Sequence, residues 1–174
     1  MSMMDKFRLD GKTAIVTGAG KGIGAGIAIA FAEAGADLII GARTEEDLNR
    51  VAGDIEALGR RALVVPTDVL DYAQLQNLAD RAMAEFGRID ILVNNAGGFP
   101  PKPVLETSAR EFEGAFRFNV STAFEMSRIC APLMKDSGSD GNILNISSVA
   151  GHKPTPCFAA YGTAKGALSL LTQE

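Results

Sequence analysis

The sequence predicts an α/β fold in which helices cover both faces of a doubly wound parallel sheet. Five short runs rich in Ile, Leu and Val alternate with longer segments of helical periodicity. The apolar runs show little polar alternation, which is typical of strands covered on both faces. Such alternation favours right-handed βαβ units and therefore a parallel sheet. A length of 174 residues is enough for a hydrophobic core, so we expect residues 1–174 to form one domain.

The alternating pattern also gives the bounds of each expected element. The predicted strands are 13–17, 37–42, 62–66, 89–93 and 142–147, and the predicted helices are 23–34, 45–58, 71–86, 109–135 and 158 to the end. The last segment stops inside a helical pattern, with no capping glycine and no further strand. Sheets of this class commonly have about six strands. We therefore expect a truncation after the fifth strand and part of the following helix, which leaves that strand at an uncovered, aggregation-prone edge.

Composition limits the partners and the compartment. The formal net charge is −4, with 22% charged and 47% hydrophobic residues. These values are typical of a soluble globular protein and argue against nonspecific binding to nucleic acid or to an anionic membrane. No apolar run is long enough to cross a bilayer, and the start, MSMMDKFRLDGK, lacks a secretory core. We expect a cytoplasmic protein.

Cysteine and histidine are scarce. The chain has one histidine and two cysteines, Cys130 and Cys157, which form no CxxC pair. A single histidine leaves little material for a metal site or a Ser–His–Asp triad. We expect no metal, a buried Cys130 and a loop position for Cys157.

A glycine-rich turn joins the first strand directly to the first helix. Its sequence is TGAGKGIG, residues 17–24. Backbone N–H groups and the helix dipole at such a turn can bind a diphosphate, and glycine places no Cβ in the way. A plain tight turn is the alternative, but the strand–turn–helix context is that of a Rossmann-like dinucleotide site. The candidate cofactor-binding residues here are Gly18, Gly20, Lys21, Gly22, Ile23 and Gly24.

The end of the second strand indicates which cofactor is preferred, because an acid there would hold the ribose of NAD. Asp37 lies at the beginning of that strand and faces away from the ligand edge, whereas Arg43 follows its far end. A guanidinium suits a phosphate, and Lys21 is placed to reach the same group. We expect NADP(H) to be favoured. The alternative is NAD(H), with Arg43 solvated and Glu45 or Glu46 at the ribose.

Polar residues follow the next strands at the same sheet edge. Asp68 and Val69 end the third strand, and the Asp68 carboxylate is expected to accept from the adenine amino group or, alternatively, to cap a helix. Asn94-Asn95-Ala96-Gly97 follows the fourth strand, and Ser147-Ser148 ends the fifth. Ligands of such sheets bind at this edge.

Two further motifs lie in predicted helices. Tyr161 and Lys165 are four residues apart, so their side chains share one face. Lowering a phenol pKa from about 10 to about 7 takes roughly 4 kcal/mol of anion stabilisation, which a desolvated ammonium and a positive nicotinamide ring can supply. Tyr-x-x-x-Lys alone is common on helix surfaces. Asn119 has poor helix propensity, which indicates a structural or catalytic role, or simple exposure.

Taken together, TGAGKGIG, NNAG, Asn119, Ser148 and Tyr161-x-x-x-Lys165 resemble the short-chain dehydrogenase/reductase family, from about residue 9 to the end. The resemblance implies that Tyr161 is the general acid/base and that Ser148, thirteen positions earlier, holds the substrate oxygen. It also implies that Lys165 binds the nicotinamide ribose and lowers the pKa of the phenol. Asn119 would anchor a water in a proton relay.

The same resemblance extends to the cofactor pocket. Asn95, Ala96 and Gly97 would wall the adenine and nicotinamide side, with Tyr161 and Lys165 also at the cofactor. Lys21 with Arg43 resembles the NADP-preferring members of the family. Chains of this family normally continue through two more strands and a substrate loop, which this sequence does not contain.

The resemblance implies an oxidoreductase that moves a hydride between NADP(H) and a ketone or secondary alcohol, with hydroxysteroids and 3-oxoacyl thioesters as candidates. An apolar substrate pocket is expected from Gly98, Phe99, Pro100, His152, Pro154, Cys157 and Phe158, with His152 at its rim. A homodimer or homotetramer through the helices near 109–135 and 158 onward is implied as well. Side chains available there for core or interface are Phe112, Phe116, Phe118, Phe124 and Met126. The competing interpretations are a nucleotide-binding regulator without turnover and a structural fragment.

Overall fold

The computed structural model describes residues 3–173 and contains a five-stranded parallel sheet in the order β3-β2-β1-β4-β5. The strands are β1 Thr13–Thr17, β2 Asp37–Ala42, β3 Ala62–Pro66, β4 Ile91–Asn94 and β5 Asn142–Asn145. The first three match the predicted bounds, whereas the predicted strands 89–93 and 142–147 are shorter or shifted. The strand order reverses between β1 and β4, which is where sheets of this class bind ligands.

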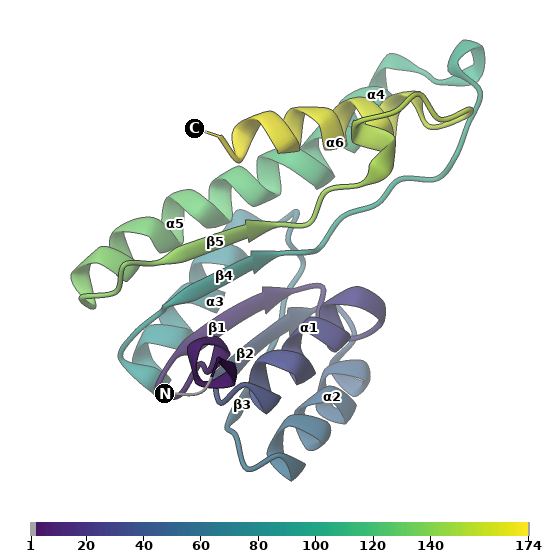
Figure 1. The fold of residues 1–174 in the computed structure, drawn as a ribbon. Helices are drawn as coiled ribbons and strands as arrows, with labels where there is room; N and C mark the ends of the chain where they lie inside the picture. Colours follow the sequence, from purple (N-terminus) through teal and green to yellow (C-terminus); the bar gives the residue numbers. More distant parts are fainter. Residues whose placement is uncertain (1–2, 174) are drawn as a thin grey trace.

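Helices lie on both faces of the sheet, as predicted (Figure 1). α1 and α2 lie on one face and α3 and α5 on the other, while α4 and α6 pack together beyond the end of β5. The helices are α1 Gly22–Glu33, α2 Glu45–Ala57, α3 Tyr72–Phe86, α4 Ala109–Phe116, α5 Thr122–Asp136 and α6 Ala159–Leu171. Short 3-10 helices span Met4–Phe7, Val104–Glu106 and Val149–Gly151. None of the helices within residues 3–173 combines the length and apolarity needed to cross a bilayer.

Two apolar layers form the core, one on each face. Alternate residues of a strand point to opposite sides, so Val16 packs with α1 and α2 whereas Ile15 packs with α3 and α5. The α1 layer is built largely from alanine, including Ala28 at 0% exposure, which lets the helix approach the sheet closely. Cys130 is buried in the other layer, as predicted, and burial raises the pKa of its thiol to about 12.

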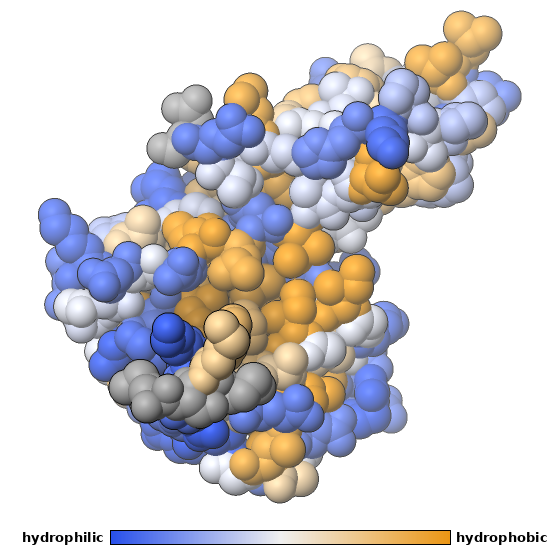
Figure 2. Space-filling view, viewed as in Figure 1, coloured by the Kyte–Doolittle hydropathy of each residue, from blue (hydrophilic) through white to orange (hydrophobic). Residues whose placement is uncertain are grey.

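One part of the sheet is bare. β5 pairs with β4 alone among the described strands, and its Leu144 is 40% exposed. Figure 2 shows apolar side chains gathered over β4 and β5 beside α1, a region that no described helix covers in Figure 1. The expected open edge is therefore present in residues 3–173. Aggregation through it stays a prediction.

The predicted helix 109–135 is wrong in one respect, because it is two helices joined by a π-helical turn over Arg117–Ser121. α4 starts with a capping box, in which Ser108 and Glu111 satisfy each other's backbone N–H groups. In the π turn, Asn119 Nδ2 donates to the carbonyl oxygen of Ala115 at 2.9 Å. A side-chain donor thus reaches back to a backbone carbonyl of the preceding helix, α4. The apolar pattern continues through the turn, so it does not reveal the extra residue.

Asp90, just before β4, links several segments at the amino-terminal ends of the strands. Its side chain is 3% exposed and accepts hydrogen bonds from Arg88 Nε at 2.7 Å and from the Thr13 N–H at 3.0 Å. Lys12 Nζ at 3.1 Å and Ser139 Oγ at 3.0 Å complete the set. Burial alone would raise the pKa of Asp90, but the four donors outweigh it and hold that pKa well below its usual range.

Asp90→Asn is expected to lower the free energy of unfolding by about 2 kcal/mol at neutral pH, because charge-assisted hydrogen bonds are lost. The folded pKa of Asp90 is lowered, so its contribution is complete above about pH 4 and is lost as pH falls through the folded pKa. The difference between wild type and variant should therefore be smaller at pH 3 than at pH 7 in urea denaturation. Asp54→Asn, on the exposed side of α2, serves as the control. Equal differences at the two pH values would contradict this role.

Candidate active site

The glycine turn between β1 and α1 packs tightly against the end of β4. Gly18 has φ 67°, in the left-handed region, and a Cβ there would lie 2.9 Å from Asn95 Nδ2. A Cβ on Gly24 would lie 2.5 Å from the same Asn95 atom and would also collide with the carbonyl oxygen of Gly18. Both positions therefore require glycine for the turn to keep this shape.

Thr17, which sequence reasoning did not single out, connects the turn to β4. Its Oγ1 accepts from the N–H groups of Asn95 and Ala96, each at 3.1 Å, and donates to the Val93 carbonyl at 3.2 Å. Asn95 Nδ2 donates in return to the carbonyl oxygens of Thr17 at 2.9 Å and Gly18 at 3.2 Å. These bonds fix the two strand ends that flank the reversal of strand order.

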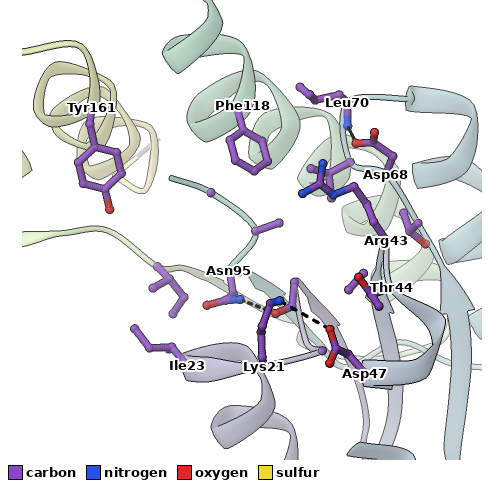
Figure 3. Close-up of a pocket in the computed structure, with 18 of the residues that line it drawn as sticks. Lys21, Ile23, Arg43, Thr44, Asp47, Asp68, Leu70, Asn95, Phe118 and Tyr161 are labelled. Atoms are coloured by element: carbon purple, nitrogen blue, oxygen red, sulfur yellow. Dashed lines mark hydrogen bonds and ion pairs between the residues drawn. The ribbon is translucent and has the colours of Figure 1, made fainter. Parts of the chain in front are cut away.

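A cavity of about 530 Å³ lies above this reversal, over the carboxyl ends of the strands (Figure 3). On the side of the glycine turn and β2–β3 it is lined by the predicted Gly18, Gly20, Lys21, Ile23, Arg43, Asp68 and Val69. On the side of β4 and α6 it is lined by the predicted Asn95, Ala96, Gly97, Tyr161 and Lys165. The predicted Gly22, Gly24, Asn119 and Ser148 do not belong to its lining.

Two predicted cations reach the cavity, Arg43 from the end of β2 and Lys21 from the glycine turn, where its side chain is 81% exposed. Glu45 and Glu46 do not line the cavity. Asp47 does, in addition to Asp68; sequence reasoning missed Asp47, although its place in the first turn of α2 was a signal. Asp37 lies at the beginning of β2, away from the cavity, as predicted, and accepts there from Arg60 Nη2 at 2.7 Å.

Asp68 lies just after β3, next to Leu70 (Figure 3). Leu70 and Phe118 are two apolar lining residues that were not predicted for this site. Asp68 Oδ1 accepts from the N–H of Leu70 at 3.0 Å. The N-cap of α3 is Asp71, whose side chain accepts from Ala73. The helix-cap alternative for Asp68 is therefore wrong.

Tyr161 and Lys165 reach the cavity from α6. The Tyr161 hydroxyl points into the cavity (Figure 3), and Lys165 Nζ lies 5.8 Å from the centroid of its ring. Lys165 is 3% exposed, and its Nζ donates to the carbonyl oxygen of Ile146, just after β5, at 2.7 Å. Burial lowers the pKa of this ammonium. A buried cation and a phenol hydroxyl thus share one wall of the cavity.

Asn119 supports the chain that leaves β4. It is 1% exposed, so the simple-exposure alternative is wrong. Its Oδ1 accepts from the Gly98 N–H at 2.9 Å, and its Nδ2 donates to the Gly98 carbonyl at 3.0 Å. A Cβ on Gly97 would lie 2.7 Å from Asn119 Oδ1 and 3.1 Å from Lys165 Nζ, so both side chains meet the backbone here.

The two serines after β5 have different surroundings. Ser147 lines the cavity, but its Oγ donates to the Lys165 carbonyl at 3.0 Å and lies 2.8 Å from Ser169 Oγ, so α6 engages the hydroxyl. Ser148 begins the 3-10 turn, and its Oγ accepts from the Ala150 N–H at 3.2 Å. The turn packs on α6 through small residues, because a Cβ on Gly162 would lie 2.6 Å from the Ala150 carbonyl oxygen.

The residues expected to form one apolar substrate pocket are divided. Phe99 packs against the alanine cluster of α4 and α6, Ala115, Ala160 and Ala164. The loop that contains His152, Pro154, Cys157 and Phe158 lines a second cavity of about 570 Å³ together with Val104. The loop after Phe99 is joined to the loop of Cys157 by a backbone hydrogen bond, in which the Lys102 N–H donates to the Cys157 carbonyl at 2.7 Å. Cys157 is exposed in this loop, as predicted.

The strand order, the glycine turn at its reversal and the polar groups at the strand ends define an α/β domain of the dinucleotide-binding class. Within that class, the chain belongs to the short-chain dehydrogenase family, whose model, described as short chain dehydrogenase, matches residues 12–174. In the range 3–173 no group of three His, Cys, Asp or Glu side chains is placed to hold a metal ion.

Relatives of known name or structure agree with this assignment. An uncharacterized oxidoreductase of Mycobacterium tuberculosis is 46% identical over 98% of this chain and 65% of its own length. The 7alpha-hydroxysteroid dehydrogenase of Escherichia coli is 41% identical over 98% of this chain and 66% of its own. This chain therefore spans about two thirds of these relatives, between 65% and 66% of their length.

Solved structures match the fold closely. A 7 alpha-hydroxysteroid dehydrogenase complexed with NADH and 7-oxo glycochenodeoxycholic acid gives a TM-score of 0.93 at 41% identity, over 98% of this chain and 66% of that one. A short-chain type dehydrogenase/reductase from Mycobacterium marinum gives 0.94 at 36% identity, over 99% and 71%. The Rossmann-like parallel sheet predicted from the sequence is thus confirmed.

Proposed function

We propose that this chain is the cofactor-binding and catalytic part of an oxidoreductase that moves a hydride between NADP(H) and a ketone or secondary alcohol. The observation that carries the proposal is the shared cavity, which is lined by the glycine turn, by Tyr161 with its hydroxyl pointing inward (Figure 3), and by the buried Lys165. Membership of the short-chain dehydrogenase family supports it.

The lining residues fit a nicotinamide dinucleotide. The turn at Gly18 and Gly20 leaves room for a diphosphate against backbone N–H groups at the start of α1. Lys21 and Arg43 would hold a 2′-phosphate, and Asp68 would accept from the adenine amino group. The cofactor, when bound, donates or accepts the hydride.

The chain's own residues would orient the substrate and move the proton. Tyr161 would give or take it at its hydroxyl oxygen, while Ser148 Oγ would hold the substrate oxygen. Lys165, held by its bond to Ile146, would bind ribose hydroxyls and stabilise the phenolate by its charge. Asn119 would keep the Gly97–Gly98 backbone in place; both its Nδ2 hydrogens are already used, so a relay water would have to bind this turn at another atom.

NAD(H) is the second candidate cofactor, and two observations favour it. A relative of 41% identity was solved with NADH, and Asp47 places a carboxylate at the cavity. The NADP(H) proposal depends instead on Lys21 and Arg43. Two other functions would be recognised by a binding assay combined with a ketone and alcohol screen. A regulator would bind the dinucleotide but turn over no ketone. A structural fragment would bind no dinucleotide.

Arg43→Ala is expected to lower kcat/KM with NADP(H) by about tenfold and to change kcat/KM with NAD(H) little, because only the first cofactor carries the 2′-phosphate that the guanidinium binds. Steady-state kinetics with each cofactor measures both values by the absorbance of the reduced nicotinamide. Lys135→Ala, which removes an exposed cation at the end of α5, is the control. A clear advantage of wild type for NAD(H) would contradict the assignment of Arg43 and Lys21.

Substrate and assembly are proposed more broadly. A relative named for 7alpha-hydroxysteroids makes a hydroxysteroid one candidate substrate among medium or large ketones and alcohols. A homodimer or homotetramer would use α4 and α5, where Phe112 is 38% and Phe124 is 52% exposed, together with α6. Met126, by contrast, is buried in the core at 1%.

A further inference from the structure

Asp47 puts a negative charge where the proposed 2′-phosphate subsite needs positive ones. Its carboxylate lies 3.7 Å from Lys21 Nζ and 3.8 Å from Arg50 Nη2. The side chain is 29% exposed and lines the same cavity as Arg43. In Figure 3 it is turned toward Lys21. Lys21 and Arg43 are therefore both in place for a phosphate, but Lys21 already has an anionic partner in Asp47.

Packing fixes Asp47 at the cavity wall. A Cβ on Gly20 would lie 3.0 Å from Asp47 Cβ and 3.6 Å from Ala42 Cβ, so the glycine turn, β2 and α2 meet at this point. Arg50 Nη2 also donates to the Gly20 carbonyl at 3.0 Å and thereby ties α2 to the turn. A cofactor in the cavity would therefore meet the carboxylate beside Lys21.

The two cofactors would affect this carboxylate in opposite ways. The pair with Lys21 is exposed and longer than a hydrogen bond, so it is weak, and a phosphate with nearly two charges can take the ammonium. The phosphate is then repelled by Asp47. A free ribose 2′-OH instead has a proton to donate, and a carboxylate accepts it.

We propose that Asp47 is a specificity-determining residue that narrows the preference for NADP(H) over NAD(H), by pairing with Lys21 and by opposing the 2′-phosphate. This inference rests on the proposed cofactor site. The first turn of α2 would then help to discriminate between the two cofactors, in addition to Arg43.

Isothermal titration calorimetry of this chain with adenosine 2′,5′-bisphosphate and with adenosine 5′-monophosphate tests the adenosine half without catalysis. The affinity ratio of bisphosphate to monophosphate should rise about fivefold in Asp47→Asn, because the repulsion is removed. Asp47→Glu keeps the charge and should stay within about twofold of wild type. Glu46→Gln removes the same charge from an exposed neighbour outside the cavity lining and should also stay within about twofold.

An unchanged or lower ratio in Asp47→Asn, or an equal rise in Glu46→Gln, overturns the role of Asp47 alone. If wild type binds neither nucleotide, the cofactor site itself is wrong and the role of Asp47 fails with it. If wild type prefers the monophosphate, only the NADP(H) preference fails, and the ratio must still rise in Asp47→Asn. Thermal melting verifies that each variant is folded; Asp47→Ser replaces Asp47→Asn if the latter does not fold.

Discussion

Tyr161→Phe is expected to lower kcat by about 10²- to 10⁴-fold, the range that a positioned general acid or base contributes. The ring keeps its place, because its contacts with Phe158, edge-on with centroids 5.8 Å apart, and with the Lys165 ammonium do not use the hydroxyl. Only the hydroxyl that points into the cavity is removed. Dinucleotide affinity should stay near that of wild type, since the glycine turn, Arg43 and Lys165 are unchanged.

The chain contains a matched control for this experiment. Tyr72, the only other tyrosine in the sequence, lies at the start of α3, is 40% exposed and does not line the main cavity. Tyr72→Phe should therefore leave kcat unchanged. Turnover is followed with a panel of ketones and alcohols, and binding by calorimetry. A Tyr161→Phe variant that retains most of its kcat would show that another group supplies the proton.

Gly24→Ala is expected to lower the free energy of unfolding by about 3 kcal/mol, at the upper end of what overpacking usually costs. The added methyl group would overlap the Gly18 carbonyl and lie 2.5 Å from Asn95 Nδ2. Relieving the overlap moves the glycine turn away from β4. Dinucleotide affinity should therefore fall more than tenfold, because that turn presents the N–H groups for the diphosphate.

Gly26→Ala provides the comparison within the same helix. Nothing lies within 4 Å of a Cβ at that exposed position, so the substitution should stabilise α1 by about 0.5–1 kcal/mol, the difference in helix propensity. Urea denaturation and calorimetry with NADP⁺ measure both variants. If Gly24→Ala and Gly26→Ala had the same effect, the close packing of the turn on β4 would have no energetic importance.

The strands of the sheet and the glycine turn were predictable because both depend on the local sequence pattern. Ile, Leu and Val runs gave β1, β2 and β3 their correct bounds. β1 and β2 are buried on both faces, which leaves a clear apolar signal, and β3 carries the same signal although it is only half-buried. β5 was predicted two residues too long, because it ends at Asn145 rather than at 147. Its apolar pattern continues beyond the last residue that pairs with β4. The π turn at Arg117–Ser121 has no periodic signal of its own.

The site was predictable to the extent that strand ends identify it. Arg43, Asp68 and Asn95 follow apolar strands, and the parallel topology brings them to one cavity. Asp47, in α2, and Phe118, in the π turn, were missed because no motif marks them and tertiary packing alone brings them to the cavity. Nothing in the sequence showed that Phe99 packs on the alanine cluster between α4 and α6 while His152 lies at a separate cavity.

The π turn holds one residue more than a regular helix would need to join α4 to α5. Deleting one residue between Arg117 and Ser121 is therefore expected to leave a continuous α-helix, in which the later side chains of α5 keep their facing. Each helical residue adds about 100° of rotation, so a further residue inserted there would turn every later side chain of α5 by that angle. Met126 and Cys130 would then leave the core, and polar neighbours would enter it. An insertion in this segment is therefore expected to be far more damaging to the packing of α5 than a deletion.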